Sequence, residues 1–152
     1  MPERNKMFVD EINQNDIASG LTGSAAGRVN FNPAAAGDYL TNENYKTLRT
    51  NLFFCGADIK VILLTSCREN DGKSTISTEL ARNLAEADKK TLFIDADMRK
   101  SLLQPRNLKQ HNHMGLSEFL SGQAEIKDII YNTQDPDFDV IFSGRFPPNP
   151  VE

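Results

Sequence analysis

Four small or charged residues, Gly72, Lys73, Ser74 and Thr75, stand between an apolar run and an amphipathic stretch. Gly72 has no side chain, so the backbone can approach an anion closely there. The amide groups that open a helix point toward such an anion, and the helix dipole adds to the attraction. Lys73 carries a compact ammonium for phosphate oxygens, and the Ser74 hydroxyl suits Mg²⁺. The pattern predicts a site for nucleotide phosphates.

Two carboxylates are expected at the same site. Asp95 and Asp97 directly follow the apolar run 91–94. Ligands of open α/β sheets bind outside the carboxyl ends of the strands, so both aspartates should open into the phosphate crevice. Hard carboxylates suit Mg²⁺ or serve as a general base. We therefore expect Lys73, Asp95 and Asp97 to act in catalysis, and Ser74, Asp95 and Asp97 to hold the metal.

The expected phosphate cradle is the backbone of six consecutive residues: Asn70, Asp71, Gly72, Lys73, Ser74 and Thr75. The pattern G-x-x-x-x-G-K-[ST] is incomplete, because Cys67 occupies its first position. Asn70 stands where a second glycine is usual, and asparagine tolerates a positive φ. From this pattern alone, an ordinary turn between a strand and a helix remains the alternative.

The flanking segments predict a βαβ unit. Residues 61–65 form a short, uncharged run that is rich in apolar and β-branched side chains, which is typical of a strand that is buried on both faces. Ile76, Leu80, Leu84 and Ala87 then fall on one stripe of a helix, and residues 91–94 form the next strand. The fold class that follows is α/β, with a parallel sheet flanked by helices.

Further elements are expected on either side of this unit. Residues 1–37 have few large apolar side chains and predict a flexible N-terminal arm, and residues 38–152 form the domain. We expect helices over 42–54, 115–122 and 124–131, and a strand over 138–142. His111 and His113 are expected to be exposed, since no acid or cysteine cluster supports a metal site there.

Composition excludes several classes of protein. The chain has 152 residues and a net charge of −4 without a basic run, which argues against nucleic-acid binding. No apolar stretch approaches the roughly 20 residues that span a membrane. The start is charged and lacks a hydrophobic signal core, so we expect the protein in the cytoplasm. Cys55 and Cys67 do not suggest a disulfide framework.

Several segments in order resemble the bacterial tyrosine kinases (BY-kinases) of capsule and exopolysaccharide synthesis. Residues 66–75 look like their Walker A motif, and residues 92–100 look like their second acidic motif, Walker A′. Residues 43–51, 115–122 and 147–150 are also similar to family segments, so the resemblance covers about 38–152. It implies a P-loop NTPase-like domain that binds ATP and Mg²⁺ and moves the γ-phosphate to a tyrosine.

The resemblance also implies partners. BY-kinases use a Glu-x-x-Arg-x-x-Arg motif for contacts between subunits, which corresponds here to Glu43, Lys46 and Arg49. Because Lys46 replaces the middle arginine, a bidentate contact there is weakened. The family also works with a membrane-anchored activator protein of polysaccharide export. Such an activator would bring the chain to the inner face of the membrane.

The end of the sequence departs from the family. Nothing after Phe142 predicts the apolar strand that ends in the Walker B aspartate. The resemblance therefore implies a domain that is incomplete at its C-terminus and exposes an apolar sheet edge. For such a domain we expect marginal stability or association, weak nucleotide binding and little autophosphorylation.

Two other functions remain open at this point. ATPases of the chromosome-partitioning and division-site type share the fold, but they carry a lysine where this chain has Arg68 and a glycine pair where it has Glu69 and Asn70. The second alternative is a regulator that binds nucleotide without performing chemistry.

Overall fold

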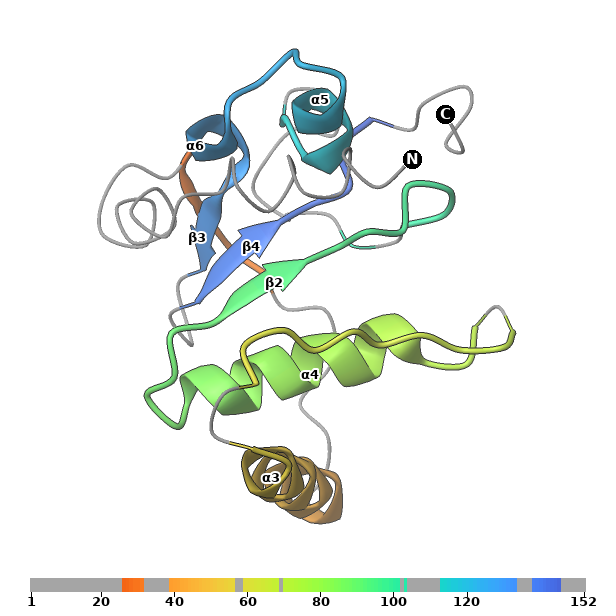
Figure 1. Ribbon diagram of the computed structural model, residues 1–152, viewed down its shortest axis with the longest axis vertical. Coiled ribbons are helices and arrows are strands. Elements are labelled where there is room, and N and C mark those ends of the chain that lie inside the picture. The colour runs from red at the N-terminus through yellow and green to blue at the C-terminus, as the bar shows by residue number, and fades with distance from the viewer. Residues whose placement is uncertain are drawn as a thin grey trace.

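A computed structural model shows a sheet with helices on both faces (Figure 1). The structure describes residues 26–31, 39–56, 59–68, 70–101, 103, 113–133 and 138–145. The elements in chain order are β1 (Arg28–Val29), α3 (Tyr39–Phe54), α4 (Lys73–Ala85), β2 (Leu92–Ile94), α5 (Leu116–Leu120), α6 (Ile126–Ile129), β3 (Tyr131–Thr133) and β4 (Asp139–Ile141). No helix of these described segments has the length and apolar character needed to cross a bilayer.

The sheet is mixed, and its strands follow the order β1-β3-β4-β2. Two pairs are parallel: β1 with β3, and β2 with β4, in which Phe93 lies opposite Val140. The pair β3–β4 is antiparallel, with Tyr131 opposite Val140. The α/β class with helices around a sheet is therefore confirmed, whereas the sheet is not parallel throughout. An antiparallel pair is possible here because β3 and β4 are joined by a short connection and need no crossover helix.

Each face of the sheet has its own hydrophobic cluster, as alternation along a strand requires. One cluster joins Phe93, Val140 and Phe142 to Ala81 of α4 and Phe31 near β1. The opposite cluster joins Ile129, Ile130 and Ile141, and α5 and α6 pack against it. The strands β2 and β4 therefore lie between α4 on one face and the pair α5–α6 on the other.

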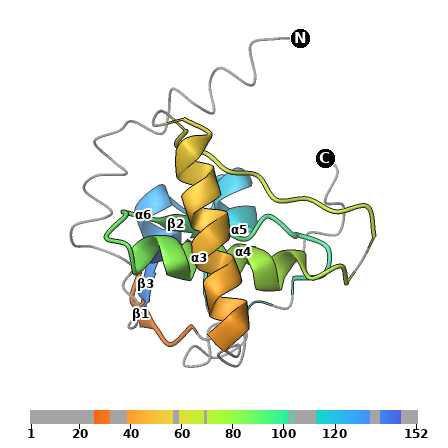
Figure 2. The ribbon, with the colours of Figure 1, turned by 90° about the horizontal axis from the view of Figure 1, so that it is seen from below.

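Helix α3 packs on the outer side of α4, which lies between it and the sheet (Figures 1 and 2). It crosses α4 when the molecule is seen from below (Figure 2). The predicted stripe of this helix is only half-buried: Tyr45, Leu48 and Leu52 are intermediate, and Phe53 is 45% exposed. The surface of α4 alone is too small to bury the whole apolar stripe of α3.

The expected strand over residues 61–65 is not formed, which corrects the sequence prediction. The segment is extended and runs beside α4, apart from the strands (Figures 1 and 2). Val61 is 86% exposed and Leu63 is 85% exposed on one face of the run, while Ile62 is 40% exposed and Leu64 is half-buried on the other, so neither face is fully buried. A strand that is buried on both faces needs paired neighbours, and the described strands do not include one beside this segment.

The N-terminal part of the chain contributes more than expected. Within the segment 1–37, residues 28–29 form β1 beside β3, and Val29 and Phe31 lie in the core. Residues 28–31 thus contribute to the sheet and its core, and residues 1–25 and 32–37 of the predicted arm lie outside the described part. The predicted helix 124–131 is also shorter in the structure, because Tyr131 begins β3.

Candidate functional site

The loop before α4 turns sharply through two residues with positive φ. Asn70 has φ 63° and Gly72 has φ 82°, so both residues lie in the left-handed region. The amide of Arg68 donates to Oδ2 of Asp71 at 3.1 Å, and the Ser66 hydroxyl donates to the carbonyl of Arg68 at 2.7 Å. A Cβ added to Gly72 would meet no heavy atom within 4 Å. The loop is thus turned by local hydrogen bonds and opens onto free space at Gly72.

The first turn of α4 presents backbone N–H donors at this opening. No side chain caps the helix at Gly72. The amide of Ile76 is bonded to the carbonyl of Gly72 at 2.9 Å, while the amides of Lys73, Ser74 and Thr75 have no acceptor in the described part of the chain. A helix N-terminus with free amides attracts an anion through these donors and through the helix dipole. This end of α4 can therefore hold phosphate oxygens.

Asp95 and Asp97 follow β2 as expected, but they lie in different environments. Asp95 is only 5% exposed. Its carboxylate accepts hydrogen bonds from the Ser101 hydroxyl and, at 3.1 Å, from the amide of Asp97. Burial raises the pKa of the Asp95 carboxyl, against these two hydrogen bonds, which lower it. A buried carboxylate with a raised pKa is suited to accept a proton.

The carboxylate of Asp97 is exposed and organises the turn that follows it. Its Oδ1 accepts the amides of Arg99 at 3.2 Å and Lys100 at 3.0 Å. This turn brings Ser101 back to Asp95. Sequence analysis did not identify Ser101, because a lone serine six positions after an aspartate carries no recognisable signal.

The predicted residues share one edge of the molecule without direct contact. The carboxyl end of β2 and the N-terminal end of α4 lie on the same side in Figure 1. Within the described residues no ion pair joins Lys73 to Asp95 or Asp97, and no cluster of three or more His, Cys, Asp or Glu side chains is placed to hold a metal. A magnesium ion bound at this edge would therefore need the Ser74 hydroxyl, phosphate oxygens and water beside the aspartates. Mg²⁺ commonly accepts such a ligand set.

The expected subunit-contact residues lie on α3 and already have contacts within the chain. Nη1 of Arg49 donates to the carbonyl oxygen of Asn83 on α4 at 2.7 Å. Nζ of Lys46 lies 2.8 Å from Oε1 of Glu43, and both side chains are 45% exposed. Arg49 thus joins α3 to α4, whereas Glu43 and Lys46 stay accessible.

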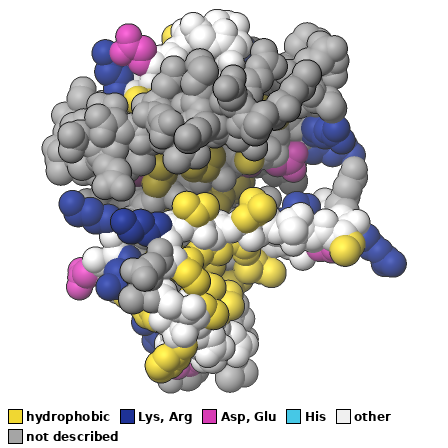
Figure 3. All heavy atoms as spheres, viewed as in Figure 1, with side chains coloured by type: hydrophobic (Ala, Val, Ile, Leu, Met, Phe, Trp, Pro, Cys, Tyr) yellow, Lys and Arg dark blue, Asp and Glu magenta, His cyan; other side chains and the backbone are white. Residues whose placement is uncertain are grey.

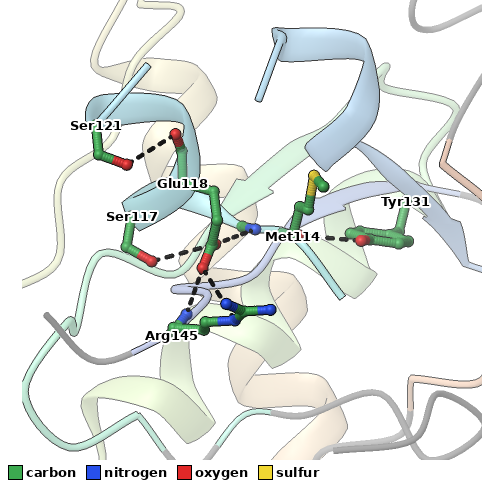
Figure 4. Close-up of polar contacts among 7 residues, drawn as sticks. Met114, Ser117, Glu118, Ser121, Tyr131 and Arg145 are labelled. Atoms are coloured by element: carbon green, nitrogen blue, oxygen red, sulfur yellow. Dashed lines mark hydrogen bonds and ion pairs between the residues drawn. The ribbon is translucent and has the colours of Figure 1, made fainter. Parts of the chain in front are cut away.

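A buried carboxylate closes α5 onto the segment after β4 (Figure 4). Glu118 is 6% exposed and accepts the amide of Gly115 at 2.7 Å, the hydroxyl of Ser117 at 3.2 Å and the amide of Arg145 at 3.2 Å. Gly144 passes so close that an added Cβ would collide with Glu118 and Ser117. These hydrogen bonds to Glu118 fix the chain just after β4, the strand that pairs with β2.

His113 does not lie in solvent as expected. Its ring packs edge-on against Phe142, with 5.8 Å between the ring centroids, and its buried Nδ1 has no hydrogen-bond partner among the described residues. Burial lowers the pKa of His113, and the nearby Glu118 carboxylate partly opposes that shift. His111 lies outside the described residues.

Comparisons with known proteins identify the family of this chain. The AAA domain family matches residues 59–145. The tyrosine-protein kinase CpsD of Streptococcus agalactiae is 46% identical over 111 residues, which are 73% of this chain and 48% of that kinase. The tyrosine-protein kinase YwqD of Bacillus subtilis is 36% identical over 115 residues, 74% of this chain and 48% of that kinase. The chain thus spans about half the length of these curated relatives.

A solved structure of a bacterial tyrosine kinase is also similar to this chain. The kinase domain of the Escherichia coli tyrosine kinase ETK superposes with a TM-score of 0.63 at 28% identity, covering 83% of this chain and 57% of that chain. The segment that matches the AAA domain family, residues 59–145, includes the loop before α4, α4 itself and β2. The chain therefore belongs to the AAA domain family, and the relatives that it resembles over about three quarters of its own length are bacterial tyrosine kinases.

Proposed function

We propose that this chain is the ATP-binding part of a tyrosine kinase that regulates capsule or exopolysaccharide synthesis. One observation carries the proposal: the uncapped N-terminus of α4 opens at Gly72, on the same edge as the buried carboxylate of Asp95. The names of its relatives as tyrosine-protein kinases support this function. Phosphoryl transfer needs mainly positioning and charge neutralisation, which such an edge can supply.

In this proposal the loop and first turn bind the triphosphate of ATP. The ammonium of Lys73 neutralises the β and γ oxygens, and the Ser74 hydroxyl contributes a ligand to Mg²⁺. The backbone of six residues donates to phosphate oxygens: Asn70, Asp71, Gly72, Lys73, Ser74 and Thr75. The left-handed conformation of Asn70 and Gly72 supports this arrangement, because it turns successive amides toward one side.

The two aspartates have separate proposed roles. Asp95 accepts the proton of the tyrosine hydroxyl while the hydroxyl oxygen bonds to the γ-phosphorus and the bond to the β-phosphate oxygen breaks. The raised pKa of Asp95 supports the role of proton acceptor. Asp97 supports the metal with the carboxylate oxygen that does not hold the Arg99 and Lys100 amides.

The proposed partners follow from the family. We propose self-association through Glu43, Lys46 and Arg49, in which Arg49 keeps its bond to Asn83 and offers its remaining N–H groups. We also propose a membrane-anchored activator of polysaccharide export, which would hold the cytoplasmic chain at the inner face of the membrane.

A second candidate function is a nucleotide-binding regulator without phosphoryl transfer. The exposed segment 61–65 favours it, because the loop that follows lacks the paired strand that would hold it in place. A loop without this support would bind nucleotide but align it less well for chemistry.

Calorimetric titration with Mg-ATP tests nucleotide binding. Replacing Lys73 with methionine should raise the dissociation constant at least about tenfold, which is about 1.4 kcal/mol. Lys90→Met is the matched control, since Lys90 is exposed and lies beyond the other end of α4. Equal affinities of the native chain and Lys73→Met would refute the proposed phosphate site.

Transfer of radiolabelled phosphate to tyrosine then separates the two functions. For a kinase, Asp95→Asn should abolish transfer and retain Mg-ATP affinity. For a regulator, the native chain should bind Mg-ATP and label no tyrosine, with or without an activator peptide.

A further inference from the structure

A small pocket lies between α3 and α4. Tyr45 lines it from α3, and Glu79, Arg82 and Asn83 line it from α4, with Glu86 at the end of that helix. None of the lining side chains is purely apolar. The pocket has a volume of about 60 Å³, well below the roughly 300 Å³ of pockets that enclose a drug-sized ligand, so it admits only a small head group.

The polar lining contrasts with the surface around it. In the space-filling view, hydrophobic side chains gather over α4 and the segment beside it (Figure 3). On α3, Leu48 and Leu52 are half-buried where this helix crosses α4 (Figure 2). Polar groups that are enclosed between helices cost free energy unless they are hydrogen-bonded. The pocket therefore favours a polar occupant.

Asn83 supplies an acceptor that the described chain leaves unused. The residue is 2% exposed. Its Nδ2 donates to the carbonyl of Glu79 at 3.0 Å, and its own carbonyl accepts a hydrogen bond from Arg49 at 2.7 Å. Its Oδ1 is buried and has no hydrogen-bond partner among the described residues. Because a buried acceptor without a donor destabilises the fold, a ligand that donates to this oxygen gains affinity.

Charge adds a second requirement for the ligand. Nε of Arg82 lies 3.1 Å from Oε1 of Glu86, so these two charges offset each other. Glu79 is half-buried and forms no ion pair within the described segments. Burial raises the pKa of the Tyr45 hydroxyl, and the Glu79 carboxylate raises it further, so these two groups interact. The pocket therefore carries an unbalanced negative charge and favours a cation.

We propose that this pocket binds a primary ammonium group, which donates its three N–H groups to Oδ1 of Asn83, the carboxylate of Glu79 and the hydroxyl oxygen of Tyr45. A guanidinium is planar and carries five donors, which these three acceptors do not match. A divalent metal ion also fits less well, because the described residues include no cluster of three or more His, Cys, Asp or Glu side chains that could hold one.

The ligand would link α3 to α4 from within their interface. Arg49 already links the two helices one turn further along α3, through its bond to the carbonyl of Asn83. Glu43 and Lys46 do not line the pocket, so the site is compatible with the self-association proposed for α3. A bound ammonium should therefore stabilise the packing of α3 on α4.

Thermal unfolding of the full chain, monitored by circular dichroism, tests the proposal with methylammonium chloride at neutral pH. Sodium chloride keeps the total salt constant. The Tm should rise and then saturate, because a ligand that binds only the folded state stabilises it. Tetramethylammonium, which has no N–H donor, should leave the Tm at its value in sodium chloride. Ammonium chloride forms a further arm: a rise with ammonium alone identifies the inorganic ion as the ligand, and a rise with both identifies primary amines, and both results support the proposal.

Two substitutions locate the site. Glu79→Gln keeps the size of the side chain and removes its charge, so the dissociation constant should rise at least about tenfold. Asn83→Leu removes the unused oxygen and should abolish the saturable rise; if this variant does not fold, Glu79→Gln decides. Asp88→Asn is the matched control, since it removes one carboxylate beyond the end of α4, does not line the pocket, and asparagine tolerates the φ of 57° there. It should bind as the native chain does.

Two results would overturn the proposal. The first is a Tm that responds equally to methylammonium, tetramethylammonium and sodium, which would mean that water alone fills the pocket. The second is a saturable rise that Glu79→Gln retains with unchanged affinity. No nucleotide is present in these measurements, so either result leaves the proposed kinase function untouched.

Discussion

The Ser101 hydroxyl donates a hydrogen bond to the carboxylate of Asp95, and both side chains are buried. Burial raises the pKa of Asp95, while this hydrogen bond favours the charged form and lowers it. Ser101→Ala should therefore raise the pKa of Asp95 further. Titration of the Asp95 carboxyl by NMR measures the change, with Ser77→Ala on α4 as the control. An unchanged or lower pKa would show that Ser101 does not stabilise the carboxylate.

Asp95 should also make stability depend on pH. Its folded pKa lies above the ordinary value of 3.8, so the folded state retains a proton that the unfolded state has lost. The stabilisation from this group is complete below pH 3.8 and is lost as the pH rises through the folded pKa. Asp95→Asn should therefore be more stable than the native chain at pH 7. Urea unfolding at several pH values should show the difference vanish below pH 3.8; a constant difference would contradict this account.

The sequence predicted the parts of the site that depend on local pattern. Helix α4 begins at Lys73 because a left-handed glycine precedes an amphipathic stretch, and Asp95 follows a short apolar strand. These relationships lie within a few residues of one another. The positive φ of Asn70 likewise follows from the residue type.

The features that the sequence did not predict depend on residues that are distant along the chain. Residues 61–65 have the composition of a central strand, but pairing is decided by neighbours that the segment itself does not contain. The strand β1 is two residues long, too short for any periodicity. Burial of Glu118 depends on Gly144, which is 26 positions away and leaves room for the carboxylate only because it lacks a side chain.

The contact between Gly144 and Glu118 should be sensitive to a single methyl group. Gly144 has φ 80°, and an added Cβ would collide with Glu118 and Ser117. Gly144→Ala should therefore destabilise the fold by about 2–4 kcal/mol, through backbone strain and the collision together. Gly122→Ala is the control, since Gly122 has φ 73° and its Cβ would meet nothing within 4 Å. It should cost only the strain, roughly 1–2 kcal/mol. Equal losses in urea unfolding would show that the close approach is unimportant.

The bond from Arg49 to the Asn83 carbonyl should stabilise the packing of α3 on α4. Arg49→Ala removes a charged donor at 2.7 Å and should lower the free energy of unfolding by about 1–2 kcal/mol. Lys46→Ala breaks an exposed pair with Glu43 and should cost less than about 0.5 kcal/mol. Thermal unfolding monitored by circular dichroism compares the two variants. If Lys46→Ala cost as much as Arg49→Ala, the interhelical bond would not be the cause.

His113 should destabilise the fold on acidification. Burial against Phe142 holds its pKa below 6.5 in the folded state, although Glu118 partly opposes the shift. The stabilisation from the neutral ring is complete above pH 6.5 and is lost as the pH falls through the folded pKa, because the unfolded state then binds more protons. His113→Phe keeps a ring against Phe142 and removes the titrating group. The native chain should therefore lose more stability than His113→Phe between pH 7.5 and 5.5, as measured by urea unfolding at both values. Parallel losses in the two proteins would place the pH dependence elsewhere in the chain.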